Sequence, residues 1–363
     1  MVFNTSSELG LRVALALGLI SLAVAAGLAL QVLAMRLAAQ RRVREVAALA
    51  SVWQPLMARV ALGEVLPEVL PGLARRDRGD LMLMWIRLQD VVRGSAHANL
   101  VEFAERLRLR DDALRWARVE RTGMARRVLG LVTLGHLGRV EDTALLRAAL
   151  DDPLPLVSLS AARALLQIDA VHFAPIMLDT FLARPDWPAP RLGTLLREAG
   201  AQAVASPLIQ KLLAGTAEQQ QRLLPLLRFA ESPHSGSAVH RLVEGSEDPQ
   251  VLSIALRQLH GPESLERVRM LASSPDALVR SAAAQALGRI GLDEDRDRLL
   301  RLMSDRDWWV RYRAAQAQLA LPGTNANAVV ALRRLITDRY ARDALDHVCA
   351  EQALQRAAVA QEA

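Results

Sequence analysis

The feature that most constrains this chain of 363 residues is a block of sequence that recurs along it. The block containing Val279-Arg280 returns 31 residues later as Val310-Arg311. A fixed period of this length is the signature of stacked repeat units, because one unit cannot bury its apolar face alone and must cover it with its neighbours. The period therefore predicts a solenoid before any single residue is interpreted.

Further copies can be traced towards the N-terminus. Two of them start at 152–157 and 248–251, and weaker copies are expected at 127–138, 190–200 and 220–229. In the clearer copies an aspartate lies beside a proline, and this pair favours a helix start because aspartate caps free amides and proline is tolerated in the first turn. Valine and then alanine follow at helical spacing, and no segment alternates like a strand. The expected fold class is all-α, an α-solenoid of helical hairpins.

The same residues carry a resemblance to a known family. The chain resembles the HEAT-repeat family in its short bacterial form, strongly over 122–340 and weakly over 45–121. The residues that carry the resemblance are Asp152-Pro153 with Val157, Pro275-Asp276 with Val279-Arg280, Ala283, Ala286, Leu287 and Gly288, and residues 305–317. The resemblance implies a curved superhelix that binds proteins, and it names no particular partner.

The ends of the repeat helices can also be predicted. Gly288 and Gly291 are expected to end a helix in the left-handed conformation that glycine adopts readily. A second apolar helix is expected between copies, at 266–271 and at 296–303.

The N-terminal region has a different composition. Val13–Met35 contains 23 residues without a charge, which as a helix would reach roughly 34 Å and cross the hydrocarbon core of a bilayer. A cleaved signal peptide is the main alternative, but its apolar core is normally about 7–15 residues long. The length favours an uncleaved transmembrane anchor, which would place the lipid bilayer among the partners of the chain.

The charges beside this stretch predict its orientation. Arg36, Arg41, Arg42 and Arg44 follow it, whereas Arg12 is the only arginine before it. The positive-inside rule then places the N-terminus outside and the repeats in the cytoplasm, at the bacterial inner membrane. The four arginines can also contact anionic lipid headgroups.

Prolines mark the region between the anchor and the strong repeats. Pro55, Pro67 and Pro71 are expected to break helices there. We therefore expect four segments, namely a short extracytoplasmic N-terminus at 1–12, the transmembrane helix at 13–35, a basic juxtamembrane segment with irregular helical hairpins at 36–121, and the HEAT-like solenoid at 122–363.

No motif in the sequence predicts catalysis. Phosphate-binding loops, a dinucleotide fingerprint and a nucleophile elbow are absent from the sequence. His234 with His240 is a candidate metal-binding pair and His347 with Cys349 a candidate catalytic pair, but their number and spacing suit neither role. We expect no cofactor, no metal and no enzymatic activity. Nucleic acid is an improbable partner, because acidic residues dilute the arginines of 102–127.

Trp308-Trp309 is the one local oddity of the repeats. Both residues precede the valine of their copy and occupy positions that hold Ala277-Leu278 in the copy before. Two interpretations remain open: the indoles cap the apolar core near the end of the stack, or they are exposed anchors for a partner. The candidate partner-binding residues are Trp308, Trp309, Arg280 and Arg311.

The sequence thus favours a membrane-anchored scaffold. It would bind a protein partner at the cytoplasmic face of the inner membrane, for example as an accessory subunit of a complex that makes or exports an envelope polysaccharide. The alternatives are a HEAT-like lyase or cofactor-handling protein, which would need a concave pocket with converging polar groups, and a membrane-tethered nucleic-acid binder.

Overall fold

The computed structural model describes residues 5–64, 69–118, 123–230 and 233–362, apart from the side chains of 5–16, 18–24, 233 and 359–362. Within these ranges every regular element is a helix, which confirms the predicted all-α class. The chain divides into two compact units, Met1–Ala164 and Leu165–Ala363. Each unit is a stack of helices that share an apolar core.

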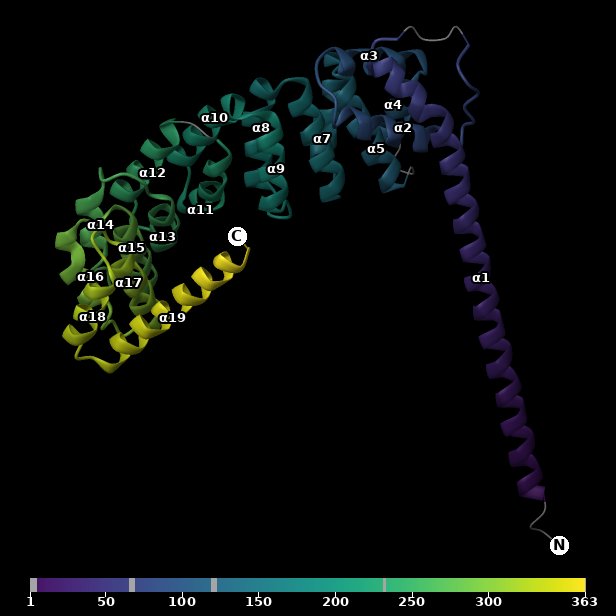
Figure 1. Ribbon diagram of the computed structural model, residues 1–363. Coiled ribbons are helices and arrows are strands. Elements are labelled where there is room, and N and C mark those ends of the chain that lie inside the picture. The colour runs from purple at the N-terminus through teal and green to yellow at the C-terminus, as the bar shows by residue number, and fades with distance from the viewer. Residues whose placement is uncertain (1–4, 65–68, 119–122, 231–232, 363) are drawn as a thin grey trace. The chain divides into compact units, whose positions relative to one another are not determined.

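The first unit begins with a long helix (Figure 1). Its helices are α1 (Thr5–Ala61), α2 (Arg78–Gln89), α3 (Ser95–Arg106), α4 (Leu109–Arg118), α5 (Met124–Leu137) and α6 (Thr143–Ala148), with a 3-10 turn on each side of α6 at Val140–Asp142 and Ala149–Asp151. Helix α7 (Pro155–Ile168) carries the boundary between the units.

Helix α1 corrects one expectation. Pro55 was predicted to break a helix, yet α1 continues through it to Ala61. Residues around Pro55 are buried against α2 and α3, among them Trp53, Leu56 and Met57. Their burial offsets the lost hydrogen bond of an internal proline, which costs about 3 kcal/mol. Pro71 lies outside the helices as expected, and Pro67 lies outside the described residues.

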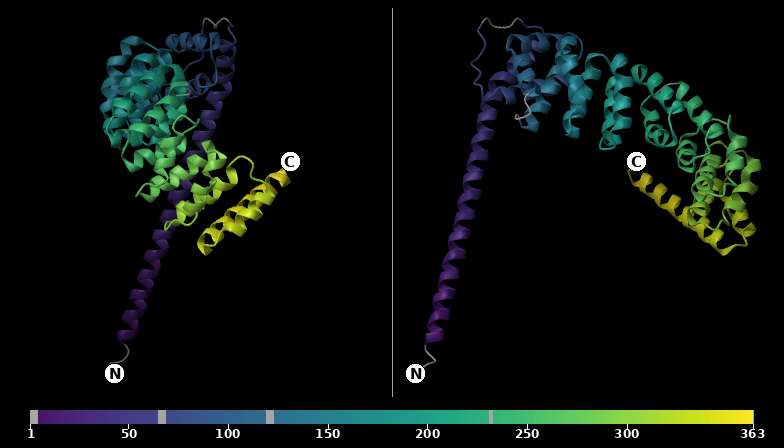
Figure 2. Two further views of the ribbon diagram at one scale, coloured as in Figure 1. Left: turned by 90° about the vertical axis from the view of Figure 1, so that its left-hand side faces the viewer. Right: turned by 180° about the vertical axis from the view of Figure 1, so that it is seen from behind.

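The N-terminal part of α1 extends beyond the helices it packs against, as the views in Figure 2 show. Among the residues searched, no helix is apolar over a length sufficient to cross a membrane. Within the predicted span Val13–Met35, the side chains of 13–16 and 18–24 lie outside the part that the structure describes.

The second unit consists of two rows of helices that alternate along the chain (Figure 1). The first row contains α9 (Ala189–Ala199), α11 (Ala217–Leu223) with the 3-10 turn Leu224–Phe229, α13 (Pro249–Gln258), α15 (Ala277–Ile290) and α17 (Trp308–Ala320). The second row contains α8 (Ala170–Ala183), α10 (Ala201–Ala214), α12 (Pro233–Gly245), α14 (Leu265–Leu271), α16 (Arg296–Leu302) after the turn Asp293–Asp295, and α18 (Ala326–Leu335). Helix α19 (Arg339–Glu362) packs on α17, in the place of a next first-row helix.

The predicted copies from 190 onwards coincide with the first row, including the weak copies at 190–200 and 220–229, whereas the copies at 127–138 and 152–157 fall on α5 and at the start of α7. Their caps are also as predicted. The side chains of Asp248, Asp276 and Asp307 accept hydrogen bonds from backbone amides in the first turns of α13, α15 and α17, respectively. Each cap satisfies a donor that a helix start would otherwise leave unpaired.

The two glycines expected to end α15 do not do so in the predicted way. Gly291 follows the helix with φ −70°, which is not left-handed, and Gly288 lies inside the helix. A Cβ added to Gly288 would lie 2.8 Å from the Cα of Ala317, so the absent side chain allows α15 and α17 to approach closely. Close packing between repeats, rather than helix termination, explains this glycine.

Candidate partner-binding surface

Arg280 lies on α15 and connects two consecutive repeats. Its Nε and Nη2 donate to the two carboxylate oxygens of Asp305 at 2.7 and 2.9 Å. Its Nη1 donates to the carbonyls of Ser274 and Pro275 at 2.8 and 2.9 Å, in the loop before its own helix. The residue is buried, so the guanidinium predicted to bind a partner is instead occupied inside the chain.

Asp305 is stabilised in its charged form by this contact. Burial is the largest single effect and would raise the pKa of the carboxyl group. The hydrogen bonds from Arg280 and from the backbone amide of Asp307, together with the charges of Arg280 and Arg306, outweigh it and hold the pKa below its usual value. The pair is therefore an ion pair at neutral pH.

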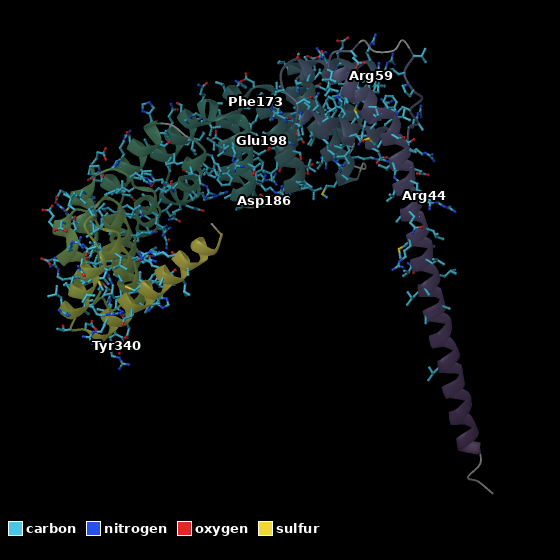
Figure 3. The ribbon with its side chains drawn as sticks, in the orientation of Figure 1. Arg44, Arg59, Phe173, Asp186, Glu198 and Tyr340 are labelled. Atoms are coloured by element: carbon cyan, nitrogen blue, oxygen red, sulfur yellow. The ribbon has the colours of Figure 1, made fainter. Side chains whose placement is uncertain are left out.

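Arg311 occupies the equivalent position on α17 but lacks such a carboxylate. Its Nη1 donates to the carbonyls of Asp305 and Arg306 at 2.8 and 3.1 Å, as Arg280 does in its own loop. Its guanidinium carbon lies 5.4 Å from the ring centroid of Tyr340, at the start of α19 (Figure 3). The cation–π contact replaces the ion pair at the last repeat, so Arg311 also serves the fold.

Trp308 and Trp309 are both exposed, with 45% and 58% of their surfaces accessible. These fractions exclude the interpretation that two buried indoles cap the core. Trp308 stacks on Tyr312 at a centroid distance of 5.2 Å and an interplanar angle of 9°. Trp309 meets Trp308 edge to face at 4.7 Å. The two rings form a preordered aromatic ledge at the start of α17.

Tyr312 anchors this ledge. Its hydroxyl donates to Glu351 Oε2 of α19 at 2.6 Å and accepts from Gln316 Nε2 at 2.7 Å. The hydrogen bond to Glu351, together with burial, raises the pKa of Tyr312. His347 completes the cluster, with its ring 6.3 Å from that of Trp308. Tyr312 was not among the predicted partner-binding residues, although its position four residues after Trp308 places both on one face of a helix.

A groove begins beside Trp309 and continues over the N-terminal half of α15. We call it the α15/α17 groove; its volume is about 380 Å³, and its lining residues are Arg257, Ala277, Leu278, Ser281, Ala282, Gln285, Asp307, Trp309 and Arg313. Its lining thus combines small, apolar and uncharged polar side chains of α15 with one indole and two arginines. Such a groove can take an extended segment or helix with one apolar anchor and nearby acidic groups.

The four arginines after the predicted span differ in their surroundings. All four are exposed. Arg42 forms an ion pair with Asp80 of α2 and lies 3.9 Å from Asp77, so it contributes to holding α1 against the first unit. Arg44 stands on the protruding part of α1 (Figure 3). Arg42 therefore has a structural contact that the sequence did not indicate.

The histidines weighed as metal ligands have other contacts. Nδ1 of His240 lies 2.8 Å from the hydroxyl of Ser264, and Nε2 lies 2.9 Å from the carbonyl oxygen of His260. Among the residues that the structure describes, no group of three or more histidine, cysteine, aspartate or glutamate side chains is placed to hold a metal ion.

Comparisons with known proteins agree with the repeat architecture. A family model for HEAT repeats matches residues 237–319, which include α13, α15 and α17. The resemblance to HEAT repeats is thereby confirmed for this part of the chain. A search of curated proteins gave no match. Solved structures give matches, among them the crystal structure of an engineered protein from a structural genomics consortium, with 14% identity, 77% of this chain and 85% of that chain covered, and a TM-score of 0.32. A likeness this distant carries no argument.

Proposed function

We propose that this protein is a non-enzymatic scaffold that binds a protein partner in the α15/α17 groove. One observation carries the proposal, namely two neighbouring exposed indoles, of which Trp309 lines that groove. Tryptophan is enriched among the residues that dominate binding energy, and neighbouring large apolar side chains left in water on a soluble surface typically mark an interaction site.

The aromatic ledge is suited to binding because it is already ordered. Stacking on Tyr312, which Glu351 holds by a hydrogen bond, limits the rotamers of Trp308 in the free protein. A partner that buries these rings then loses less side-chain entropy than it would on a mobile surface.

Charge suggests the chemistry of the partner. Arg257 and Arg313 flank the groove, and neither donates to a carboxylate among the hydrogen bonds and ion pairs of the described residues. Asp307, the only acidic residue in the lining, caps α17. We propose a partner segment that places an apolar side chain against Trp309 and acidic side chains near the two arginines.

We further propose that residues 13–35 anchor the scaffold in the bacterial inner membrane, with the N-terminus outside and the repeats in the cytoplasm. The uncharged length of this stretch and the four arginines after it support the proposal. The partner would then be a membrane complex, and one that makes or exports an envelope polysaccharide suits a single-span accessory subunit. That setting rests on the architecture alone.

Photo-crosslinking tests the binding surface. A photoreactive amino acid placed at position 309 of the full chain in cells should trap a partner, which mass spectrometry then identifies. The double variant Trp308→Ala/Trp309→Ala should lose that partner in pull-downs, since removing a buried hot spot weakens affinity by roughly thirtyfold or more. The matched control Met270→Ala/Leu292→Ala removes two exposed apolar side chains elsewhere and should retain the partner. Equal recovery by both double variants would contradict the proposal.

Cys349 tests the topology because it is the single cysteine of the chain. It is half-buried, and this burial raises the pKa of its thiol, so the folded chain is labelled slowly and the unfolded chain completely. A membrane-impermeant maleimide should leave it unlabelled in intact spheroplasts and label it after permeabilisation in denaturant. If the maleimide labelled Cys349 in intact spheroplasts without denaturant, the repeats would lie outside the inner membrane.

A further inference from the structure

A large cavity lies in the first unit, whereas the α15/α17 groove belongs to the second. It has a volume of about 1180 Å³ and is bounded by side chains of α2, α4, α5 and the turn before α2, with Arg42 of α1 at its edge. Eight arginines and three aspartates line it. The sequence does not indicate this group of arginines, because they come from segments far apart in the chain.

Five of these arginines have carboxylate partners. Arg42 pairs with Asp80, Arg78 and Arg115 with Asp112, Arg76 with Asp77, and Arg163 with Asp90. The ion pairs of the described residues include no carboxylate partner for Arg75, Arg108 or Arg126. Among the aspartates that line the cavity, Asp111 alone has no arginine partner in those ion pairs. Three cations and one anion thus remain uncompensated in one concave site, which favours an anionic ligand.

The backbone of Arg108 supports a functional reading of this excess. Arg108 has φ 53°, the one positive φ at a residue other than glycine among the described residues. It terminates α3 in a left-handed turn, a position where glycine would fit without strain. Strain of this kind persists where the surrounding structure enforces it and is concentrated at binding sites.

Arg78 enforces that turn. Its Nη2 donates to the carbonyls of Leu107 and Arg108 at 2.6 and 3.2 Å, while its Nε pairs with Asp112. The C-terminal end of α3 is therefore held by a half-buried cation, and Arg108 lines the cavity. Arg78 is a positioning residue for Arg108.

The rest of the cavity surface is apolar. Leu83 of α2, Met124 of α5 and Leu156 of α7 line it and are each between 41% and 47% exposed. Trp116 also lines the cavity, with the guanidinium carbon of Arg126 at 5.9 Å from its ring centroid. A ligand that satisfies both parts carries a negative group joined to a hydrocarbon chain.

We propose that this cavity binds an anionic phospholipid, with the phosphate near Arg75, Arg108 and Arg126 and an acyl chain along Leu83, Met124 and Leu156. Its source follows from α1, since Arg42 lies seven residues after Met35 on the same helix, about 10 Å beyond the end of the proposed span. That source rests on the membrane anchoring proposed above. The site would bind the scaffold to acidic lipid in addition to its anchor.

The test uses the full chain in a neutral maltoside detergent doped with a photoreactive phosphatidic acid, or with the phosphatidylcholine that carries the same photoreactive acyl chain. We expect phosphatidic acid to label the chain far more strongly, with adducts on peptides from α2, α4 or α5. Micelles need no oriented bilayer, so this result is independent of the topology assay on Cys349, and the two proposals can fail separately.

The variant Arg75→Gln/Arg108→Gln/Arg126→Gln should reduce the labelling roughly tenfold, because charged contacts to the phosphate are lost. The control Arg87→Gln/Arg106→Gln/Arg147→Gln removes three exposed arginines of the same unit outside the cavity and should retain it. If the first variant lost its helical circular dichroism, the single variant Arg75→Gln would replace it, because Arg75 lies on an exposed turn. We expect this single variant to reduce the labelling by phosphatidic acid less than the triple variant. Equal labelling by both lipids, or by both triple variants, would overturn the proposal. Displacement by millimolar inorganic phosphate would overturn the lipid source in favour of free phosphate.

Discussion

Arg280 and Asp305 form a two-pronged ion pair across 25 residues of sequence, from α15 to the loop before α17. Arg127 and Asp152 form an ion pair at the same separation, from α5 to the loop before α7. An arginine in one repeat thus reaches the aspartate of the next turn in both units. The same guanidinium of Arg280 holds its own preceding loop, so this contact fixes the spacing of successive hairpins.

Arg280→Met should destabilise the second unit. The change leaves Asp305 and two loop carbonyls without their donor, and removing one partner of a buried ion pair costs about 3–5 kcal/mol. The thermal midpoint by circular dichroism should fall by roughly 6–20 °C for a unit of this size. Arg301→Gln, which changes an exposed arginine on α16, should leave the midpoint unchanged. A midpoint that Arg280→Met does not alter would show that the clamp is dispensable.

His136 should make the stability of the first unit depend on pH. It is buried, and this burial lowers its pKa from 6.5 to about 4, against the opposing effect of Asp90 and with smaller lowering effects from Arg163 and His97. Its Nε2 lies 3.3 Å from Asp90 Oδ1 without forming a hydrogen bond. The unfolded chain therefore binds a proton between pH 6.5 and 4 that the folded chain does not.

It follows that stability is complete above about pH 6.5 and falls as the pH decreases towards 4, by about 3 kcal/mol in total. Urea unfolding of the full chain at several pH values measures this slope. His136→Leu should flatten the dependence in that window, whereas His260→Gln, at an exposed histidine, should not. If the free energy of unfolding of His136→Leu still fell with decreasing pH in this window, other groups would be responsible for the effect.

Gly288→Ala tests the close approach of two repeats. Alanine raises helix propensity by about 1 kcal/mol. At this site, however, the new methyl group would lie 2.8 Å from the Cα of Ala317, and overpacking of this kind costs about 1–3 kcal/mol. We expect a net loss of stability. Gly236→Ala on α12 adds a methyl group with nothing within 4 Å and should be neutral or stabilising. Equal effects of the two changes would argue against the packing role.

The aromatic ledge predicts unequal effects of its two tryptophans on stability. Trp309→Ala should change the thermal midpoint little, because more than half of this side chain is exposed. Trp308→Ala should cost about 0.5–1.5 kcal/mol, the value of its stacking on Tyr312. Differential scanning fluorimetry of both single variants measures this difference. A large fall of the thermal midpoint on Trp309→Ala would show that this side chain contributes to the apolar core.

Much of the fold could be predicted from the sequence. The 31-residue spacing between Val279-Arg280 and Val310-Arg311, with aspartates at the helix starts, was sufficient for the helical class and the first row of repeats. These properties depend on local signals, since capping and helical periodicity act within a few residues. The HEAT-repeat resemblance followed from the same residues.

The candidate sites could be predicted only in part. Trp308 and Trp309 were found because they break the repeat, but their exposure depended on where α19 lies and on the contact from Tyr312 to Glu351. Arg280 was assigned to partner binding because its distant acceptor, Asp305, has no signature in a single copy.

The sequence by itself determined which segments are helices and in which order they repeat, because those properties arise from neighbours along the chain. The tertiary structure alone decided which arginines are neutralised. Arg280 meets a carboxylate 25 residues away, whereas Arg75, Arg108 and Arg126 converge on one cavity from three separate segments without one. The physical reason is that an ion pair depends on distance in space, and packing of helices sets that distance.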